Sequence, residues 1–272
     1  MRGWPNDRIL GLAGRLLVIA ILGFILCPAL VVTVAAFNAK AILTFPPEAF
    51  SLRWFAKALA YDDFRSGLRN GLLVTCWASI IALAVGAAFA YVIDRYDFTG
   101  KTVLEAILLA PLVIPHFTIG IGLLIVTAKL GVGRGFPVLV IAHVILVLPF
   151  VMRSVYISLR NLDRRLELVA ASLGAPPGKV LLTVTLPLLM PGLVSGWLFA
   201  AILSLNEFTA SLFVTIQRTQ TLPVAMYNHV REFADPSMAA LSVLYIALIA
   251  LLLIAADLFL GLGRVLNVEP AC

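Results

Sequence analysis

The spacing of the charged residues is the feature that most constrains how this chain can fold. Six stretches of 18 or more residues contain no Asp, Glu, Lys or Arg. The shortest of them would rise about 27 Å as an α-helix, close to the thickness of the hydrocarbon core of a bilayer. Backbone polar groups must be paired inside lipid, so such stretches predict transmembrane helices. The six stretches are residues 16–39, 70–93, 106–128, 135–152, 180–206 and 236–256.

Composition supports the same fold class. Of the 272 residues, 62% are hydrophobic and 12% are charged, whereas a soluble domain has about 25% charged residues. The short alternating strands of a membrane barrel are absent from the sequence. We therefore predict an all-α membrane protein with a single transmembrane domain over residues 1–272. Its six predicted spans cover approximately residues 15–38, 69–93, 104–128, 136–158, 187–212 and 237–262.

The ends of the first span suggest the orientation. Its charge-free stretch is longer than the apolar core of about 7–15 residues in a secretory signal, so we expect an uncleaved span. Basic residues divide almost equally between the two sides of the six-span topology. Arg2, Arg8 and Arg15 favour a cytoplasmic N-terminus, because the first helix usually dominates. Six spans then place both termini in the cytoplasm. The net charge of +6 gives no case for nucleic acid, because no basic stripe is interleaved with aromatic residues.

Two loops carry further local signals. After the first span, Ser51 can cap a short helix on the outer surface, with Leu52, Phe55, Ala56 and Leu59 on one face; an irregular loop is the alternative. The next loop ends in Gly100-Lys101-Thr102, the tail of a phosphate-binding motif. The glycine required five residues earlier is replaced by Arg95, so this is interpreted as a polar turn.

Two pairs of prolines interrupt predicted spans. Pro111 and Pro115 lie in the third span, and Pro187 and Pro191 lie at the start of the fifth. Broken helices at membrane depth are tolerated where they face protein or a watery path. Proline is also generally common in transmembrane helices. Two pairs together favour a transport protein.

The segment between the fourth and fifth spans has a compact pattern of its own. Asp163 can cap a short helix that Gly174 ends, and two prolines then enforce a turn. Pro187 and Pro191 are expected to bend the chain as it re-enters the bilayer. The alternative is an amphipathic helix that rests on the lipid surface. The apolar face of this helix would comprise Leu166, Val169, Ala170 and Leu173.

This segment resembles the cytoplasmic loop of the permease subunits of binding-protein-dependent ABC importers. Their pattern is Glu-Ala-Ala, three residues, Gly, nine residues, Ile, one residue, Leu-Pro. Gly174, Val184 and Leu186-Pro187 match its spacing. The alanine positions hold Val169 and Ala170, and the glutamate position holds Leu168, with Glu167 one position earlier. The later stretch SLNEFTASLFVTIQRTQTLPVAMYNHV (204–230) resembles the polyamine (spermidine/putrescine) subfamily, which has relatives for iron, phosphonates or opines.

The resemblance implies a type I importer permease fold, with a coupling helix in the loop at approximately 160–186. It implies a multi-pass protein of the bacterial inner membrane that works with a second permease subunit, two cytoplasmic ATPases and an extracytoplasmic binding protein. The chain itself would be non-catalytic and bind no cofactor, with ATP and Mg held by the ATPases. The residues implied to couple to the ATPase are Asp163, Leu166, Glu167, Val169, Ala170, Gly174, Ala175, Leu186 and Pro187.

Ionisable residues within the spans indicate where a substrate passes. Asn206 and Glu207 lie deep in the fifth hydrophobic segment, where a carboxylate costs about 2.5–3.5 kcal/mol on insertion scales. Glu207 is therefore a candidate contact for a cationic substrate. The alternative is an ion pair or hydrogen bond with a neighbouring helix or the second permease subunit. Glu105 and Asp257 lie nearer span ends, where headgroup water is accessible.

The three histidines, His116, His143 and His229, lie apart in the sequence without acids or cysteines at ligand spacing. We expect packing or hydrogen bonding between helices and no metal site. No Ser–His, His–Glu or paired-Asp set supports an intramembrane enzyme. We therefore predict an importer permease for a small, cationic solute such as a polyamine. The alternative is a secondary transporter or channel driven by an ion gradient.

Overall fold

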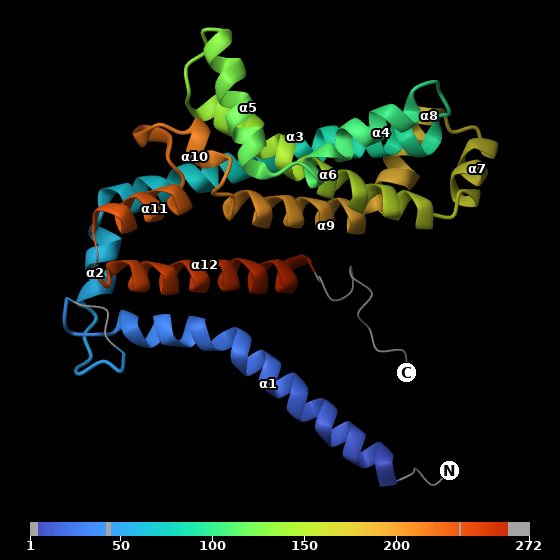
Figure 1. The fold of residues 1–272 in the computed structure, drawn as a ribbon. Coiled ribbons are helices and arrows are strands. Elements are labelled where there is room, and N and C mark those ends of the chain that lie inside the picture. Colours follow the sequence, from blue (N-terminus) through green and yellow to red (C-terminus); the bar gives the residue numbers. More distant parts are fainter. Residues whose placement is uncertain (1–4, 42–44, 234, 261–272) are drawn as a thin grey trace. The chain divides into compact units, whose positions relative to one another are not determined.

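The computed structural model describes residues 5–41, 45–233 and 235–260, and it is helical almost throughout (Figure 1). Within these residues the only bridge between extended segments pairs Asn38 with Phe50. The all-α prediction is therefore confirmed. The chain forms two compact units, one of residues 1–61 with 228–248, and the other of residues 62–227 with residue 249 onward.

The first unit contains α1 (Pro5–Ala36), α2 (Arg53–Ala60) and the first half of α12 (Ser237–Leu260). Its buried cluster includes Trp54, whose Nε1 donates a hydrogen bond of 2.8 Å to the Asn38 carbonyl oxygen. The expected cap at Ser51 is wrong: the N-cap residue of α2 is Leu52, without a side-chain capping bond, and the Ser51 hydroxyl accepts from the Arg53 amide at 3.2 Å in the turn before the helix. The expected apolar face is wrong: Trp54 and Ala58 are the buried residues of α2, while Leu52 and Leu59 are exposed.

The second unit is built on three long helices that pack against one another, α3 (Asp62–Arg95), α6 (Phe136–Asn161) and α9 (Leu186–Leu205). Close approach of α6 and α9 depends on Gly192. A Cβ atom there would lie 2.1 Å from the Ser158 hydroxyl oxygen, and the Gly192 carbonyl accepts from Ser154 Oγ at 3.0 Å. Small residues are the usual means by which membrane helices approach each other.

Shorter helices connect and cover these three. In chain order they are α4 (Lys101–Leu109), the 3-10 helix η1 (Ala110–Leu112), α5 (His116–Lys129), α7 (Arg165–Ser172), α8 (Pro177–Val180), the π-helix η2 (Leu181–Thr185), α10 (Ser211–Val214), the 3-10 helix η3 (Gln217–Thr219) and α11 (Leu222–Glu232). The last residues of α11 belong to the first unit.

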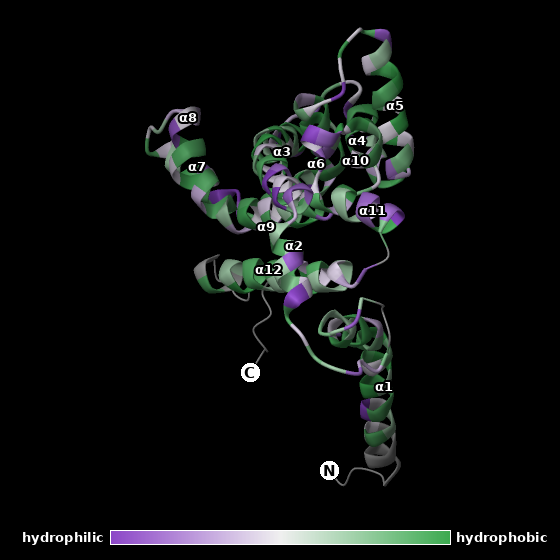
Figure 2. Ribbon diagram, turned by 90° about the vertical axis from the view of Figure 1, so that its left-hand side faces the viewer, coloured by the Kyte–Doolittle hydropathy of each residue, from purple (hydrophilic) through white to green (hydrophobic). Residues whose placement is uncertain are grey.

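Among the described residues, five helices are long and apolar enough to cross a membrane. They correspond to the first, second, fourth, fifth and sixth predicted spans, and Figure 2 shows the hydrophobic colouring of α1 and α12 along their length. The third predicted span differs, because its two halves, 101–112 and 116–129, are bent by 106°. The end of the sixth predicted span, at 261–262, lies outside the described residues, as do Arg2 and the side chains of Arg8 and Asp257.

The two proline pairs behave differently. Pro111 and Pro115 flank the bend of the third span, as the sequence predicts. The expected bend at Pro187 and Pro191 is wrong, because residues 177–205 form one continuous helical stretch. Pro187 follows the π-helical turn η2 and lies in the first turn of α9, where a missing amide is tolerated. The wider turn of η2 gives the proline ring room that a regular α-helical turn would deny it.

Candidate functional site

The loop between α6 and α9 forms a capped helix, α7. At its start the expected cap by Asp163 is wrong: the N-cap residue is Arg164, without a side-chain capping bond, and Asp163 Oδ1 accepts from the Arg165 amide at 3.0 Å in the turn before the helix. Gly174 has φ of 85°, and the amides of Gly174 and Ala175 bond back to the Ala171 and Ala170 carbonyls at 2.9 and 3.2 Å. This pair of bonds is the Schellman motif. It requires a left-handed backbone conformation at the residue after the helix, which glycine adopts without strain. The predicted helix and its glycine end are confirmed.

Glu167 fixes α7 to the rest of the second unit. Its Oε1 accepts from Arg95 Nη2 at 2.6 Å, at the end of α3, and from Thr185 Oγ1 at 2.5 Å, in the π-helical turn. A second ion pair joins Arg164 to Asp94 at 2.9 Å. The Glu167 and Arg95 side chains are only 17% and 12% exposed. Three separate segments therefore meet at one carboxylate.

The sequence did not reveal this arrangement. Arg95 and Thr185 lie 72 and 18 residues from Glu167, and nothing in their local patterns points to the loop. The shift of the acid by one position from the family pattern has a structural consequence. Leu168, which occupies the glutamate position, is exposed, while Glu167 turns inward.

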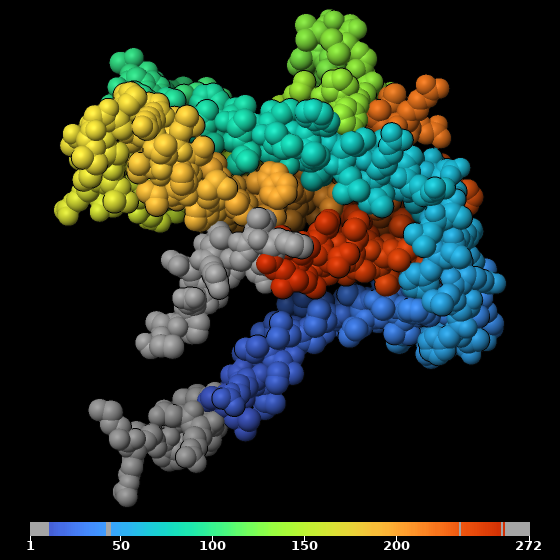
Figure 3. All heavy atoms as spheres, turned by 180° about the vertical axis from the view of Figure 1, so that it is seen from behind, coloured from blue at the N-terminus to red at the C-terminus, as the bar shows by residue number. Residues whose placement is uncertain are grey.

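The outer surface of α7 is apolar. Figure 3 shows α7 and α8 (yellow) at one end of the second unit. Ala170 and Ala175 are half-buried. Pro187, at the start of α9, is exposed. The exposed large hydrophobic residues of this region are Leu166, Leu168, Val169, Leu173 and Leu186. Exposed apolar surface of this extent on a short helix is typical of a site that another protein covers.

A second site lies where two broken helices meet. One break separates α9 from α10, and the other is the bend between η1 and α5. Gly120 of α5 packs on the first break so closely that a Cβ atom would lie 2.9 Å from Ala210 Cα. Irregular backbone at membrane depth is tolerated where it is buried in protein or lines a cavity.

Glu207 lies in the first break and is bound on both oxygens. Its Oε1 accepts from the Ala210 amide at 2.6 Å, and its Oε2 lies 2.8 Å from His116 Nδ1, the first residue of α5. The Glu207 side chain is 8% exposed and that of His116 is 48% exposed. The partner of the acid, left open by the sequence, is thus a histidine 91 residues away, for which the sequence predicts packing or hydrogen bonding between helices without indicating the partner.

His143 braces the same break from α6. Its Nδ1 and Nε2 lie 2.8 Å from the hydroxyls of Ser204 and Ser211, and the Ser211 hydroxyl donates to the Glu207 carbonyl oxygen at 3.2 Å. Because the single Ser211 hydroxyl proton is used in this way, Nε2 must donate to Ser211 and Nδ1 must accept from Ser204. A neutral imidazole in one tautomer satisfies all three bonds. The prediction that His143 bonds between helices is confirmed.

These residues surround a cavity of about 210 Å³. Its polar wall is formed by His116, His143, Asn206 and Glu207, and its apolar wall by Leu146, Val147, Phe150 and Leu203. Asn206 is the residue directly after α9, and its side-chain amide nitrogen donates to the Ile202 carbonyl oxygen at 2.8 Å. A cavity with one carboxylate and a hydrocarbon wall suits a ligand that carries both a cationic group and methylene groups.

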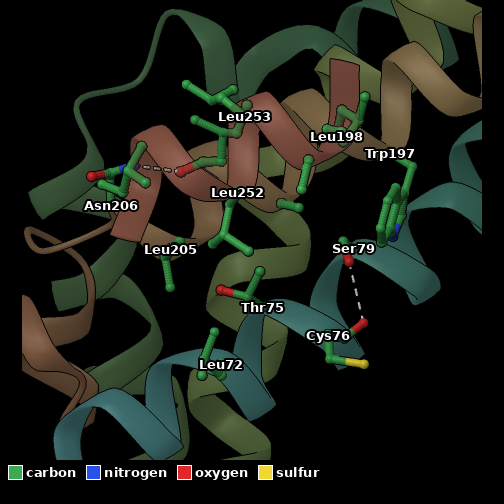
Figure 4. A pocket seen from close by; sticks show the side chains of 15 residues that line it. Leu72, Thr75, Cys76, Ser79, Trp197, Leu198, Leu205, Asn206, Leu252 and Leu253 are labelled. Carbon is green, nitrogen blue, oxygen red and sulfur yellow. Dashed lines mark hydrogen bonds between the residues drawn. The ribbon is translucent and has the colours of Figure 1, made fainter. Parts of the chain in front are cut away.

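A larger hollow of about 480 Å³ lies between α3, α9 and the second half of α12 (Figure 4). Leu72, Leu205, Leu252 and Leu253 are among its lining residues, and Ser79 donates to the Cys76 carbonyl at 3.2 Å within the same helix. Among the side chains that the structure describes, those lining this groove are uncharged.

Outside the spans, two ion pairs each contain a carboxyl group whose pKa is lowered from its usual value. Burial opposes ionisation of Asp235, but hydrogen bonds from Lys57 and Ser237 outweigh it and lower the pKa of this carboxyl to about 2. The Asp97 carboxyl has a lowered pKa because Lys101 donates to it at 2.9 Å. The Lys57–Asp235 pair, at 2.5 Å, ties α2 to the start of α12 inside the first unit.

Comparison with solved structures identifies the fold. The chain superposes on a chain of a bacterial ABC transporter involved in the import of the acidic polysaccharide alginate with a TM-score of 0.74, at 16% identity, covering 95% of this chain and 99% of that one. It also matches the MetNI methionine ABC transporter in inward-facing conformations, with a TM-score of 0.60, at 18% identity, over 75% and 95% of the two chains. The type I permease fold is therefore confirmed.

Sequence comparison finds relatives over most of the chain. The putrescine transport system permease protein PotI of Escherichia coli (strain K12) is 32% identical over 244 residues, which are 86% of both proteins. The spermidine/putrescine transport system permease protein PotC of the same strain is 28% identical over 249 residues, 90% of this chain and 94% of that protein. Residues 80–261 match the family described as binding-protein-dependent transport system inner membrane component. With a match over most of its length, this chain belongs to that family.

Proposed function

We propose that this permease forms the translocation path for a small organic cation, such as a polyamine. The observation that carries the proposal is the buried carboxylate of Glu207 at a helix break, beside a cavity of about 210 Å³. A carboxylate at membrane depth is expensive and is by default functional. Its neighbours Leu203 and Phe150 supply an apolar wall against which methylene groups can pack.

The chemistry of the site favours a cation over other solutes. Among the residues that the structure describes, Glu207 is the only acid of the cavity, and none of its lining residues is a lysine or arginine. The relatives PotI and PotC are named as permeases for putrescine and for spermidine/putrescine. A further relative, WtpB of Pyrococcus abyssi, 30% identical over 69% of this chain, is named for molybdate/tungstate, and an anion would be repelled by Glu207.

The proposed complex contains a second permease subunit, so that two permeases form a heterodimer, with two cytoplasmic ATPases that bind ATP and Mg. An extracytoplasmic binding protein delivers the substrate, and the chain itself carries out no catalysis and binds no cofactor. A solved relative of similar fold is an alginate transporter in complex with its periplasmic protein. The proposed contact with the ATPase is α7, whose exposed residues include Leu168, Val169 and Leu173.

In this arrangement both termini and residues 160–180 face the cytoplasm. The basic N-terminus favours the same orientation.

The test is replacement of Glu207 by Gln, which keeps the shape and removes the charge. In the reconstituted complex, putrescine uptake should fall at least about tenfold, as expected for loss of one charge-assisted contact worth about 1.4 kcal/mol or more. Complex recovery and ATP hydrolysis should persist. Glu232→Gln, which removes an exposed acid from α11, is the control and should leave uptake unchanged. Loss of assembly in Glu207→Gln would show a structural role, and unchanged uptake would remove Glu207 from the path.

A further inference from the structure

The two oxygens of Glu207 have unequal partners. Oε1 is held by the Ala210 amide, a backbone group of the same loop, at 2.6 Å. Oε2 is held by His116, a side chain from a different helix, at 2.8 Å. A backbone partner three residues away stays with the acid when the helices move, whereas a side-chain partner on another helix can leave. Oε2 is therefore the oxygen at which partners can be exchanged.

His116 is placed to leave. It is the first residue of α5 and directly follows Pro115, at the bend between η1 and α5. Nearly half of its side chain is exposed, against 8% for Glu207. Within the described part of the chain, the bond to Glu207 is the only hydrogen bond that its ring makes. By contrast, both ring nitrogens of His143 are engaged by serine hydroxyls.

An empty path needs such a partner. An unpaired carboxylate in the membrane interior is energetically costly, so the acid requires a donor when no substrate is bound. An imidazole N–H and a primary ammonium N–H are both donors that a carboxylate oxygen accepts, and the charged forms of both are cations. His116 and an alkylammonium group can therefore occupy the same oxygen in turn, at the edge of the same cavity.

We propose that His116 is a tethered stand-in for the substrate: it holds Glu207 Oε2 when the path is empty, and an ammonium group of the substrate displaces it. This inference rests on the proposed function, because it requires a cation to reach Glu207. It adds a specificity device, since only a solute that outcompetes the imidazole for the carboxylate gains the site. A solute without a hydrogen-bond donor would have no means of releasing His116.

The proposal makes opposite predictions for two substitutions at one position. His116→Gln keeps a hydrogen-bonding side chain but weakens the competitor, so putrescine uptake by the reconstituted complex should equal or exceed that of wild type. His116→Lys supplies a permanent cation, so uptake should fall about tenfold, equivalent to about 1.4 kcal/mol of stronger pairing. A purely structural role of His116 would make both variants lose uptake together.

Complex recovery is measured for each variant, and Glu207→Gln is run beside them. Loss of uptake in His116→Gln while the complex assembles overturns the inference, and so does wild-type uptake in assembled His116→Lys. If His116→Lys fails to assemble, His116→Gln decides alone, because uptake below wild type refutes displacement. Unchanged uptake in Glu207→Gln refutes the proposed function itself, whereas loss in Glu207→Gln combined with parallel losses in both His116 variants refutes the displacement alone.

Discussion

Replacement of Glu167 by Gln should loosen α7 without disturbing the spans. The eight residues of α7 are too few to form a stable helix alone, so its order depends on how it is held. The Glu167 carboxylate holds it through Arg95 and Thr185. Glutamine has the same shape and can accept the same two hydrogen bonds, but without charge. The variant therefore isolates the contribution of the charge.

The magnitude follows from the two bonds. Hydrogen bonds to charged groups contribute about 1.5–3 kcal/mol and neutral ones about 0.5–1.5 kcal/mol, so each replaced bond loses about 1 kcal/mol. Both bonds are well shielded from water, since Glu167 and Arg95 are 17% and 12% exposed. Arg95 keeps Asp94 as a neighbour at 3.7 Å, so no isolated buried charge is created. Local opening of α7 should become easier by about 2 kcal/mol, or roughly 30-fold.

Hydrogen exchange of the α7 amides in the purified complex, followed by mass spectrometry, measures this opening directly. The control is Arg165→Gln, which removes an exposed charge from the same helix and should change exchange less than about threefold, since such surface substitutions stay within about 0.5 kcal/mol. Exchange in Glu167→Gln within threefold of wild type, or equal acceleration in the control, would refute the role assigned to Glu167. In reconstituted membranes, the same variant should transport less substrate per ATP hydrolysed.

Three further outcomes are expected. In Gly174→Val the valine must adopt the left-handed φ of 85° at a cost of about 1 kcal/mol or more. The variant should therefore weaken ATPase attachment or uncouple hydrolysis from uptake, whereas the control Gly178→Val should be tolerated. Wild-type behaviour of Gly174→Val in both assays would show that α7 is not the coupling element. Because the pKa of Asp235 is lowered from 3.8 to about 2, its pair with Lys57 should stabilise the fold above pH 4 and lose this effect as the pH falls towards 2; thermal unfolding of wild type and Lys57→Met should converge at the lowest pH, and equal curves at pH 6 would contradict the assignment. In a background without Cys27, Cys76 and Cys272, cysteines at Ser172 and Gln217 should be labelled from opposite sides of the membrane, and labelling of both from outside would falsify the topology.

The spans were the most predictable part of the fold. Charge-free length alone located five continuous helices, because lipid leaves so few alternatives for the backbone. Proline was a less reliable guide. Pro111 and Pro115 flank a bend of 106°, yet Pro187 and Pro191 lie in a continuous helix. The difference is local: Pro187 occupies a first turn after a π-helical turn, and the sequence carries no signal for that turn.

The sites were only half predictable. Gly174 acts on residues within a few positions of itself, so the C-terminal end of α7 could be inferred from sequence, whereas the N-cap falls on Arg164, one residue after Asp163. Pairs between distant segments could not, because a single sequence contains no signal for which helices are neighbours. Glu207 was identified as a candidate without its partner His116, and Glu167 without Arg95. The family membership favours the importer over the alternative of an ion-driven transporter or channel.

One helix connects the two sites. Directly before α9, Thr185 of η2 is bonded to Glu167 and therefore to α7, the proposed coupling helix. At the other end, α9 stops at Leu205, two residues before Glu207. The 20 residues between them span about 30 Å, and a helix of that length moves as a rigid element. A displacement of α7 would therefore reach the break that holds Glu207 by way of the covalent chain itself. His116 stands outside that chain, on α5, so motion of α9 changes the distance between the acid and its histidine while the Ala210 amide moves with the acid. In the proposed mechanism, one movement of α9 both loosens the contact with His116 and carries the Glu207 oxygen to which the substrate would bind.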